Sequence, residues 1–254
     1  MRVRFIGWET VLVGFALLAV IPKSVSAGWE DNRCVTCHET ERLPISLGHS
    51  FEEWRASEHA RSGVGCEKCH GGNAAAKDMA AAHAGVLPAA DPKSMVNQVH
   101  IPATCGACHS NELKAYSSTV HAKQVAKDGE GATCFTCHGS MATSLPSPNE
   151  LNTRCSVCHK KPVQAKMALA MLASTRMKLQ RTSRTVETTR SSDPEWYADA
   201  HRRLLDLERK YRDLGPAWHT FDVDLVIEQT HALQKLALLL DEEVSVRSRL
   251  KPQP

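Results

Sequence analysis

The chain has 254 residues, of which 42% are apolar and only 5% aromatic, so it is long enough for one large domain or two small ones. Its formal net charge at pH 7 is +3, from 31 basic and 28 acidic residues, and this near balance argues against a dedicated nucleic-acid-binding protein. The charge is divided unevenly. Residues 28–159 contain 11 basic and 14 acidic side chains, a net charge of −3, whereas residues 160–254 contain 17 and 13, a net charge of +4. The two halves therefore differ electrostatically.

Residues 1–27 have the pattern of a secretory signal peptide. Arg2 and Arg4 precede an apolar stretch at residues 11–22, and Val25-Ser26-Ala27 offers a small-residue cleavage site after Ala27. The alternative is an uncleaved N-terminal anchor, although twelve apolar residues fall short of the roughly 20 that a membrane-spanning helix requires. Both interpretations predict export to the periplasm or another extracytoplasmic compartment.

All ten cysteines fall into five Cys-x-x-Cys-His motifs, the attachment signature of c-type haem. Two thiols three positions apart can each bond one vinyl group of a porphyrin, and the next residue presents its imidazole to the iron as the proximal ligand. We therefore predict five covalently attached haems. The attachment residues are Cys34, Cys37, Cys66, Cys69, Cys105, Cys108, Cys134, Cys137, Cys155 and Cys158. The proximal iron ligands are His38, His70, His109, His138 and His159.

Three other interpretations of the cysteines fit less well. A disulfide framework does not require a histidine after every second cysteine. Tetrahedral zinc sites would combine the cysteine pairs two by two, and five pairs is an odd number. A thioredoxin-like redox pair needs one motif on a βα unit, and this chain has five.

Large aromatic side chains are too few to fill the interior of the cysteine-rich region. The 126 residues from Cys34 to His159 contain only Phe51, Trp54, Tyr116 and Phe135. Five haems in this length correspond to one for about 25 residues, so the porphyrin rings would supply the apolar interior in place of side chains. Haems packed this closely would lie near enough to pass electrons to one another.

The cysteine-rich region contains an internal repeat of a two-motif module. In both copies an aromatic residue, a hydroxyl residue and a His-Ala pair precede a motif that ends in Cys-His-Gly. Trp54 aligns with Tyr116, Ser57 with Thr119, and His59 with His121, while Cys155 begins what resembles a truncated third copy. We predict that His59 and His121 are distal iron ligands; the alternative is that they are exposed.

Eight histidines lie outside the motifs, and five of them belong to the cysteine-rich region: His49, His59, His83, His100 and His121. Five motifs and five further histidines predict bis-histidine ligation of every haem, with His49, His83 and His100 as the remaining distal ligands; the alternative is that these three are exposed on the surface. Met79, Met95 and Met141 are alternative ligands, which would raise a haem's reduction potential. His201, His219 and His231 lie in the C-terminal half, where we expect structural or exposed roles, His219 being the least ordinary of the three.

The segment Trp-x-x-Ser-x-His-Ala before Cys-x-x-Cys-His-Gly, with DPKSMVNQVHIPATCGACHSNELKAY after it, resembles a known group. This group is the multihaem cytochrome c superfamily of the hydroxylamine-oxidation cytochromes, the ammonia-forming nitrite reductases and their electron-carrier relatives. The likeness covers about residues 34–160. It implies haems in parallel-stacked and perpendicular pairs, mostly bis-histidine ligated, with long helices after the last motif.

Two departures from this pattern bear on function. The nitrite reductases of the group have a catalytic motif that ends in lysine, whereas all five motifs here end in histidine. Related carriers often have a histidine soon after the second Cys-His-Gly of a module, but Gly139 is followed by Ser140-Met141, with no histidine before Cys155. The distal ligand of one haem is therefore left open.

The cysteine-free C-terminal half predicts three helices. The first runs from Val163 to about Glu187, and Ser191 to Pro194 ends it and caps the next. The second runs from Glu195 to Leu214 and stops at Gly215-Pro216. The third runs from Asp222 to about Arg249 with a broad apolar face. The predicted fold is mainly α, with a haem-cored domain of little regular structure (residues 28–160) and a C-terminal helical bundle or hairpin (residues 161–254).

The sequence thus predicts electron transfer by an exported pentahaem c-type cytochrome, with no catalytic residue assigned. One alternative is a reductase or oxidase of a small nitrogen or sulfur compound with one open haem site. Another is a subunit of a larger haem-wired complex or filament. The expected partners are redox proteins or a quinol-oxidising membrane complex, and the C-terminal helices could form an oligomer or dock a partner through the basic positions of residues 176–190.

Overall fold

The computed structural model describes residues 28–40, 48–141, 147–160 and 162–249, so the predicted signal peptide lies outside the described residues. Within these ranges the regular structure is helical and contains no strand, which confirms the predicted mainly-α class. No helix in the described part of the chain is long and apolar enough to cross a membrane.

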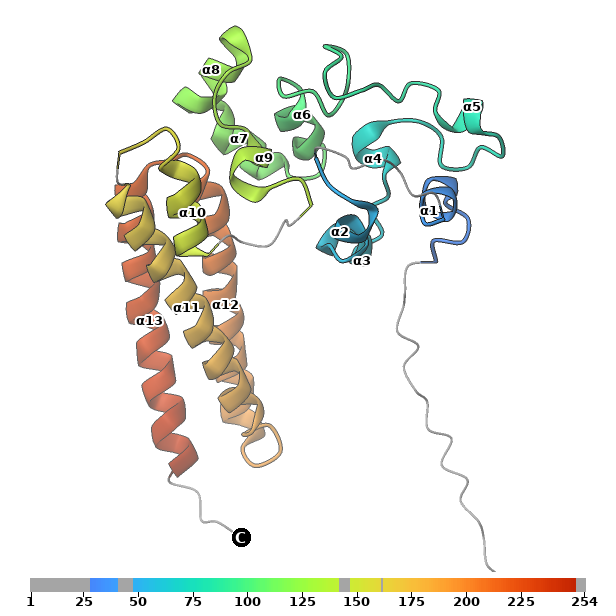
Figure 1. The fold of residues 1–254 in the computed structure, drawn as a ribbon. Helices are drawn as coiled ribbons and strands as arrows, with labels where there is room; N and C mark the ends of the chain where they lie inside the picture. Colours follow the sequence, from blue (N-terminus) through green and yellow to red (C-terminus); the bar gives the residue numbers. More distant parts are fainter. Residues whose placement is uncertain (1–27, 41–47, 142–146, 161, 250–254) are drawn as a thin grey trace, which may run out of the picture.

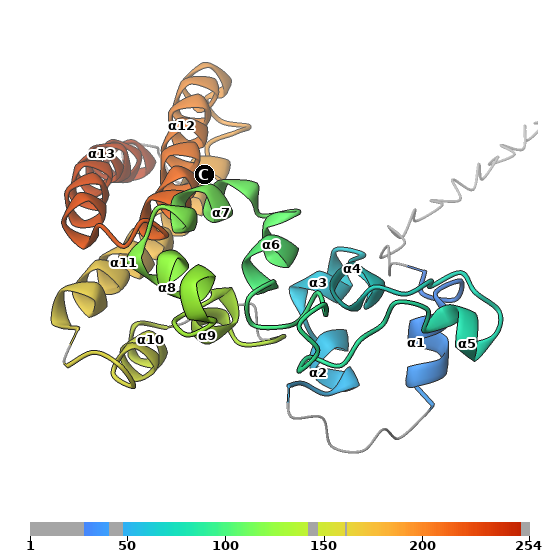
Figure 2. The same ribbon diagram turned by 90° about the horizontal axis from the view of Figure 1, so that it is seen from above.

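Two groups of short helices precede a bundle of three long ones (Figure 1). The first group comprises α1 (Arg33–His38), α2 (Phe51–Arg55), α3 (Glu58–Arg61), α4 (Glu67–His70) and α5 (Met79–Ala82). The second group comprises α6 (Ile101–Gly106), α7 (Ser110–Ser117), α8 (Val120–Asp128), α9 (Cys134–His138) and α10 (Pro148–Cys155). The second group lies between the first group and the bundle in both views (Figure 1, Figure 2).

Each Cys-x-x-Cys-His motif lies on a single helical turn. In the second, third and fifth motifs the histidine N–H donates to the carbonyl of the first cysteine, at 2.9, 3.0 and 2.8 Å. In the first and fourth motifs the histidine is the last residue of α1 and α9. Because residues three and four apart share a helix face, this turn places both thiols and the imidazole on one side of the backbone.

The C-terminal half forms the three-helix bundle of α11 (Val163–Glu187), α12 (Pro194–Trp218) and α13 (Val223–Arg249). Two aspartates cap its helices: Asp193 accepts a hydrogen bond from the backbone N–H of Trp196 at 3.2 Å, and Asp222 accepts one from Leu225 at 3.0 Å. The bundle core consists of buried apolar side chains from all three helices, including Leu179, Val186, Leu204, Leu207, Leu233 and Leu240. The first and third predicted helices are confirmed.

The predicted end of the second long helix is wrong, because α12 continues through Gly215-Pro216 to Trp218. Proline has no N–H, so Pro216 removes one helical hydrogen bond. It lies in the last turn, so only two helical residues follow it. The carbonyl of Gly215 instead accepts a hydrogen bond from Nδ1 of His219 at 2.7 Å. The side chain of His219 therefore caps the helix, which we expected to stop at Gly215-Pro216.

The region of short helices has a much smaller core of side chains. Its main apolar cluster consists of Val35, Trp54 and Ala60, with Trp29, Phe51, Cys66 and Met141 packed against it. α7 packs on α12 and α10 packs on α11, so this region contacts the bundle through its second group of helices.

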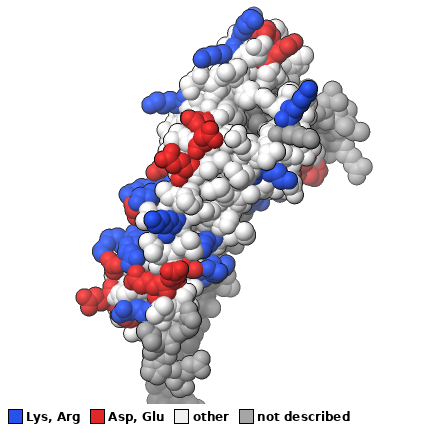
Figure 3. Space-filling model, turned by 90° about the vertical axis from the view of Figure 1, so that its left-hand side faces the viewer, with Lys and Arg blue, Asp and Glu red and all other residues white. Residues whose placement is uncertain are grey.

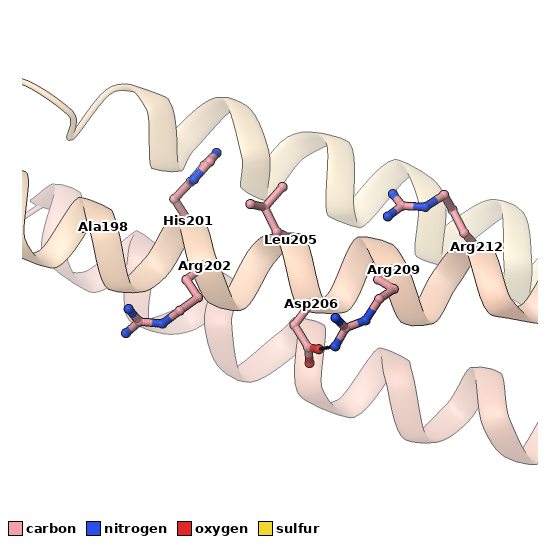
Figure 4. A pocket seen from close by; sticks show the side chains of 7 residues that line it. All are labelled: Ala198, His201, Arg202, Leu205, Asp206, Arg209 and Arg212. Atoms are coloured by element: carbon pink, nitrogen blue, oxygen red, sulfur yellow. Dashed lines mark hydrogen bonds and ion pairs between the residues drawn. The ribbon is translucent and has the colours of Figure 1, made fainter.

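The outer surface of the bundle has mixed charge. Lysine and arginine side chains are interspersed with aspartate and glutamate on the face in Figure 3, and within the basic stretch Arg181 pairs with Asp241 and Arg190 with Glu187. An open depression of about 520 Å³ follows one face of α12, and all its lining residues come from that helix (Figure 4). His201, at one end of it, stacks on Tyr197 with ring centres 5.3 Å apart. This depression is a furrow on a helix surface and brings together no residues from different elements.

Candidate functional site

Each of the five motif histidines faces one histidine from outside the motifs. The ring centres of every pair lie 5.8–6.3 Å apart. The pairs are His38–His83 at 6.0 Å, His70–His49 at 5.8 Å, His109–His59 at 6.3 Å, His138–His219 at 5.9 Å and His159–His121 at 5.9 Å. No histidine belongs to two pairs, so five motifs give five separate candidate metal centres.

The separation of the rings fits two ligands of one metal ion. Because a histidine nitrogen binds a metal at about 2.0–2.1 Å and lies about 1 Å from its ring centre, two imidazoles on opposite sides of one ion have centres about 6 Å apart. Aromatic rings that merely touch span a wider range of centre distances, about 4.5–7 Å. The five pairs cluster near the value for a shared ion, and each combines one motif histidine with one other.

Backbone hydrogen bonds orient three of the non-motif imidazoles. Nδ1 of His49 lies 3.1 Å from the carbonyl oxygen of Ser50, Nδ1 of His83 lies 2.8 Å from that of Met79, and Nδ1 of His219 lies 2.7 Å from that of Gly215. A carbonyl oxygen only accepts, so Nδ1 is the donor in each neutral ring. In such a neutral ring the lone pair lies on Nε2. This is the tautomer in which a second hydrogen bond fixes a metal-binding histidine.

His100 departs from the prediction that it is a distal ligand. Its Nε2 lies 2.8 Å from the carbonyl oxygen of Pro92, so this nitrogen acts as a hydrogen-bond donor. Its ring is paired with none of the motif histidines, because Asn97 to Ile101 form the turn that leads into α6 and hold the residue at the N-cap of that helix. The structure uses His100 to brace the loop before the third motif.

His219 takes the position that the sequence left open. It follows α12 in the C-terminal half, 81 residues after His138, and the two ring planes differ by only 14°. We expected a structural or exposed role for this residue. The one signal in the sequence was the absence of a histidine between Gly139 and Cys155, which implied a ligand from elsewhere but did not identify it.

The structure places His59 and His121 at equivalent positions in the two modules. Each precedes one motif but faces the histidine of the following motif, so His59 pairs with His109 and His121 pairs with His159. The histidine just upstream of Cys66 therefore lies opposite the third motif, and the second motif is faced by His49 instead.

The contacts around these two histidines repeat as well. Ser57 and Thr119 are both N-cap residues, each accepting a backbone hydrogen bond three positions on. The indole of Trp54 donates to the carbonyl of Val64 at 3.1 Å, and the hydroxyl of Tyr116 donates to that of Ala132 at 2.9 Å. Both acceptors lie two residues before a motif cysteine, so a buried aromatic ring links each His-Ala segment to the motif that follows it.

Burial favours the neutral, metal-binding form of four of the paired imidazoles. The pKa of each is lowered, first by burial and next by the histidine that faces it; these residues are His59, His70, His121 and His138. A histidine binds a metal through a neutral ring nitrogen, so this environment prepares the ligand without a change in protonation at neutral pH.

Thiols of successive motifs lie beside one another in chain order. The hydrogen bond between the Cys105 and Cys134 thiols raises the pKa of the first and lowers that of the second to about 7. Burial first and then a neighbouring motif's thiol raise the pKa of three others. The pairs are Cys66 beside Cys34, Cys69 beside Cys108, and Cys137 beside Cys155. The five motifs therefore form one continuous series, in which each is adjacent to the next.

The structure also bears on the alternative roles of the cysteines, in disulfides or zinc sites, and on the alternative methionine ligands. All ten cysteines lie in the described ranges, and no disulfide joins any two of them there. The described residues contain no group of three or more histidine, cysteine, aspartate or glutamate side chains placed to bind a metal ion on their own. Of the alternative methionine ligands, Met79 is 78% exposed, whereas Met141 lines a small cavity with His49 and His70.

Comparison with known proteins supports haem as the group that these centres bind. The family model for cytochrome c554 and c-prime matches residues 22–71. The C-type polyheme cytochrome OmcC of Geobacter sulfurreducens is 34% identical over 89 residues, which cover 35% of this chain and 11% of that protein. OmcB from the same species, described as a C-type polyheme cytochrome, is 32% identical over 119 residues, covering 42% of this chain and 14% of that protein. No solved structure matches the chain.

The matched segments thus span a small part of these much longer relatives. The family model matches residues 22–71, which contain the first two motifs. The residues of the five centres suit covalently attached haem: two thiols and one imidazole on a helical turn, with a second imidazole opposite. The matched segments are similar to multihaem c-type cytochromes, and these likenesses support covalent haem attachment at the motifs.

Proposed function

We propose that the chain is an exported pentahaem electron carrier in which two histidines ligate every haem iron. The observation that carries this proposal is the one-to-one pairing of the five motif histidines with five other histidines at 5.8–6.3 Å. An iron with both axial positions occupied by protein has no free site for a substrate. Electron transfer is the function that such a centre supports best.

The protein's own residues have three roles in this proposal. The ten cysteines form thioether bonds, the motif histidines are proximal ligands, and the distal ligands are His49, His59, His83, His121 and His219. Each bound haem would supply one-electron chemistry, its iron being reduced by an electron from a reduced donor and reoxidised by an oxidised acceptor. The neutral imidazoles set the potential together with burial of the site.

The order of the motifs supports a linear path for electrons. Thiols of the first and second, second and third, third and fourth, and fourth and fifth motifs are neighbours. The first centre lies in the helices farthest from the bundle, and the fifth lies where α8 and the end of α10 approach it (Figure 2). Electrons would enter at one end of this series and leave at the other.

The first experiment combines intact-mass measurement with low-temperature electron paramagnetic resonance (EPR) of the oxidised protein. We expect the mass of five attached haems and only low-spin ferric signals, because every distal position is occupied. Nitrite and hydroxylamine should leave these signals unchanged. A high-spin signal in the wild-type protein that shifts when either compound is added would overturn the carrier assignment in favour of the reductase or oxidase.

A matched pair of variants tests the least expected ligand. His219→Ala should convert one haem of the five to the high-spin state, whereas His100→Ala should leave all five low-spin, since its Nε2 is bonded to Pro92. His219→Met offers a thioether in place of the imidazole and should restore a low-spin iron at higher potential. The ligand assignment fails if His100→Ala produces the high-spin haem and His219→Ala does not.

Export and partners belong to the same proposal. Covalent haem and the N-terminal pattern of residues 1–27 support an extracytoplasmic location, and redox proteins or a quinol-oxidising membrane complex are the partners that a carrier needs. Fractionation of the producing cell tests the location. Size measurement at low and high salt distinguishes a monomeric shuttle from a subunit of a larger assembly.

A further inference from the structure

One four-residue turn of the helical bundle touches two of the candidate centres. Residues 219–222 connect α12 to α13, and His219 faces His138 of the fourth motif. Two residues later, the ring of Phe221 lies 4.7 Å from that of His121, centre to centre, and the two planes meet at 89°. His121 faces His159 of the fifth motif, so this edge-to-face contact bears on the fifth centre.

The backbone of Phe221 adopts a conformation that its residue type disfavours. Its φ is +58°, the left-handed region, and among the described residues it is the one non-glycine position with positive φ. A bulky side chain is strained there, and glycine or asparagine is the usual occupant. Such strain persists where the surroundings enforce it, and it points to a requirement for the side chain itself.

Hydrogen bonds on both sides hold the turn in this conformation. Nδ1 of His219 is bonded to the carbonyl of Gly215, and Oγ1 of Thr220 donates to the carbonyl of Ala217 at 2.8 Å. The N–H of Asp222 donates back to the hydroxyl of Thr220 at 3.2 Å. The position of the Phe221 ring is thus determined by the ends of α12 and α13.

The contact restricts the imidazole of His121. An edge-to-face arrangement is the favoured geometry for two aromatic rings, so rotation of His121 about its side-chain bond would break it. The ring planes of His121 and His159 are 75° apart in the present arrangement. In a low-spin ferric haem the angle between two axial imidazole planes sets the splitting of the iron d orbitals, and hence the shape of the EPR signal.

We propose that Phe221 is a positioning residue that fixes the ring plane of His121, and thereby ties the electronic state of the fifth haem to the folded helical bundle. This inference rests on the proposed function, because it requires that His121 ligate a haem iron. Phe221 touches the ligand and not the iron. Contacts to the outer side of a ligating histidine are known to orient it and to tune the metal.

The test begins by assigning the signal of the fifth haem. In the full-length holoprotein, His121→Ala should convert one low-spin EPR signal to high-spin, and the signal that disappears belongs to this centre. If His121→Ala leaves every haem low-spin, the ligand assignment of the proposed function fails at this step, whatever Phe221 does.

Three substitutions then distinguish the effect of the Phe221 ring from the effect of its backbone conformation. Phe221→Gly removes the ring and suits the left-handed backbone, so a merely structural residue would leave the assigned signal in place. If Phe221 positions His121, Phe221→Gly and Phe221→Leu should both shift that signal and the potential of that haem. Phe221→Tyr, which retains an aromatic ring, should keep both at their wild-type values. Haem content and far-ultraviolet circular dichroism verify that each variant is folded; if Phe221→Gly is not, the comparison of leucine with tyrosine decides.

A control variant removes another ring that contacts a histidine in the same bundle. Tyr197 stacks on His201 near the opposite end of α12, and Tyr197→Leu should leave all haem signals unchanged. The proposal is overturned if Phe221→Gly and Phe221→Leu retain the wild-type signal, or if Phe221→Tyr shifts it as much as leucine does.

Discussion

The bundle and the haem-binding region are built on different kinds of interior. The bundle buries a continuous set of side chains from three long helices, with Leu204 only 2% exposed and Leu240 only 1%. The haem-binding region consists of short helices, and its main cluster has only Val35, Trp54 and Ala60 at its centre. A region of this length cannot be stabilised by so few apolar contacts. We therefore expect the bundle to fold on its sequence alone and the other region to need bound haem.

The two regions are nevertheless linked through single side chains. His219 and Phe221 leave the bundle at one turn and reach the fourth and fifth centres. The bundle thus supplies two side chains to centres of the haem-binding region. Only the fourth centre takes a histidine from the bundle, whereas the other four draw both histidines from residues 28–160, and the fifth touches the bundle through Phe221.

The largest expected effect comes from removing the cofactor. When all ten cysteines are replaced by alanine, or the protein is produced without haem attachment, the haem-binding region should lose its structure and the bundle should remain folded. Limited proteolysis followed by mass measurement should then leave a protected fragment close to residues 163–249. Uniform digestion of both regions would show that the bundle is not autonomous.

A substitution in the bundle core tests whether buried side chains stabilise the bundle. Leu240→Ala should destabilise the bundle by about 2–5 kcal/mol, since it leaves a cavity among packed helices. Leu238→Ala, two positions along α13 and 42% exposed, should change stability by less than about 0.5 kcal/mol. Denaturation monitored by circular dichroism, with haem absorbance as a separate probe, measures this because the protein need not unfold in one step. Equal effects would contradict the assigned core.

The two modules offer a smaller test within the haem-binding region. Ser57→Ala and Thr119→Ala each remove the N-cap of the helix that carries His59 or His121, and each should cost about 1 kcal/mol. Ser118→Ala, at the exposed position next to Thr119, is the control. Denaturation followed by haem absorbance gives the values. If one cap matters and the other does not, the modules are not equivalent in energy.

The smallest effect is expected on the surface of the bundle. Arg209→Gln breaks the exposed ion pair with Asp206 in the furrow of α12, and the denaturation midpoint should not change measurably. Haem signals should be unaffected as well, since the furrow contains none of the paired histidines. A clear loss of stability, or a shift in any EPR signal, would assign the furrow a role in coupling the two regions.

Local chemistry explains what could be predicted from the sequence. A Cys-x-x-Cys-His motif acts within one helical turn, so spacing alone predicts the attachment residues and the proximal histidines. Caps and apolar periodicity likewise placed α11 and α13, because these signals lie within a few residues of the helix ends. The end of α12 was missed because the Gly215-Pro216 pair lies in a turn that His219 completes with its side chain.

The histidines that face the motif histidines were only partly predictable, and for the same reason. The repeat pointed to His59 and His121 as a class, but it could not say that each faces the motif after its own. Counting histidines favoured His100 over His219, and the structure places them the other way round. The facing histidines are up to 81 positions apart in the sequence, and no local signal encodes such a contact. It was decided by how the bundle packs on the second group of short helices, because only that packing brings His219 to His138.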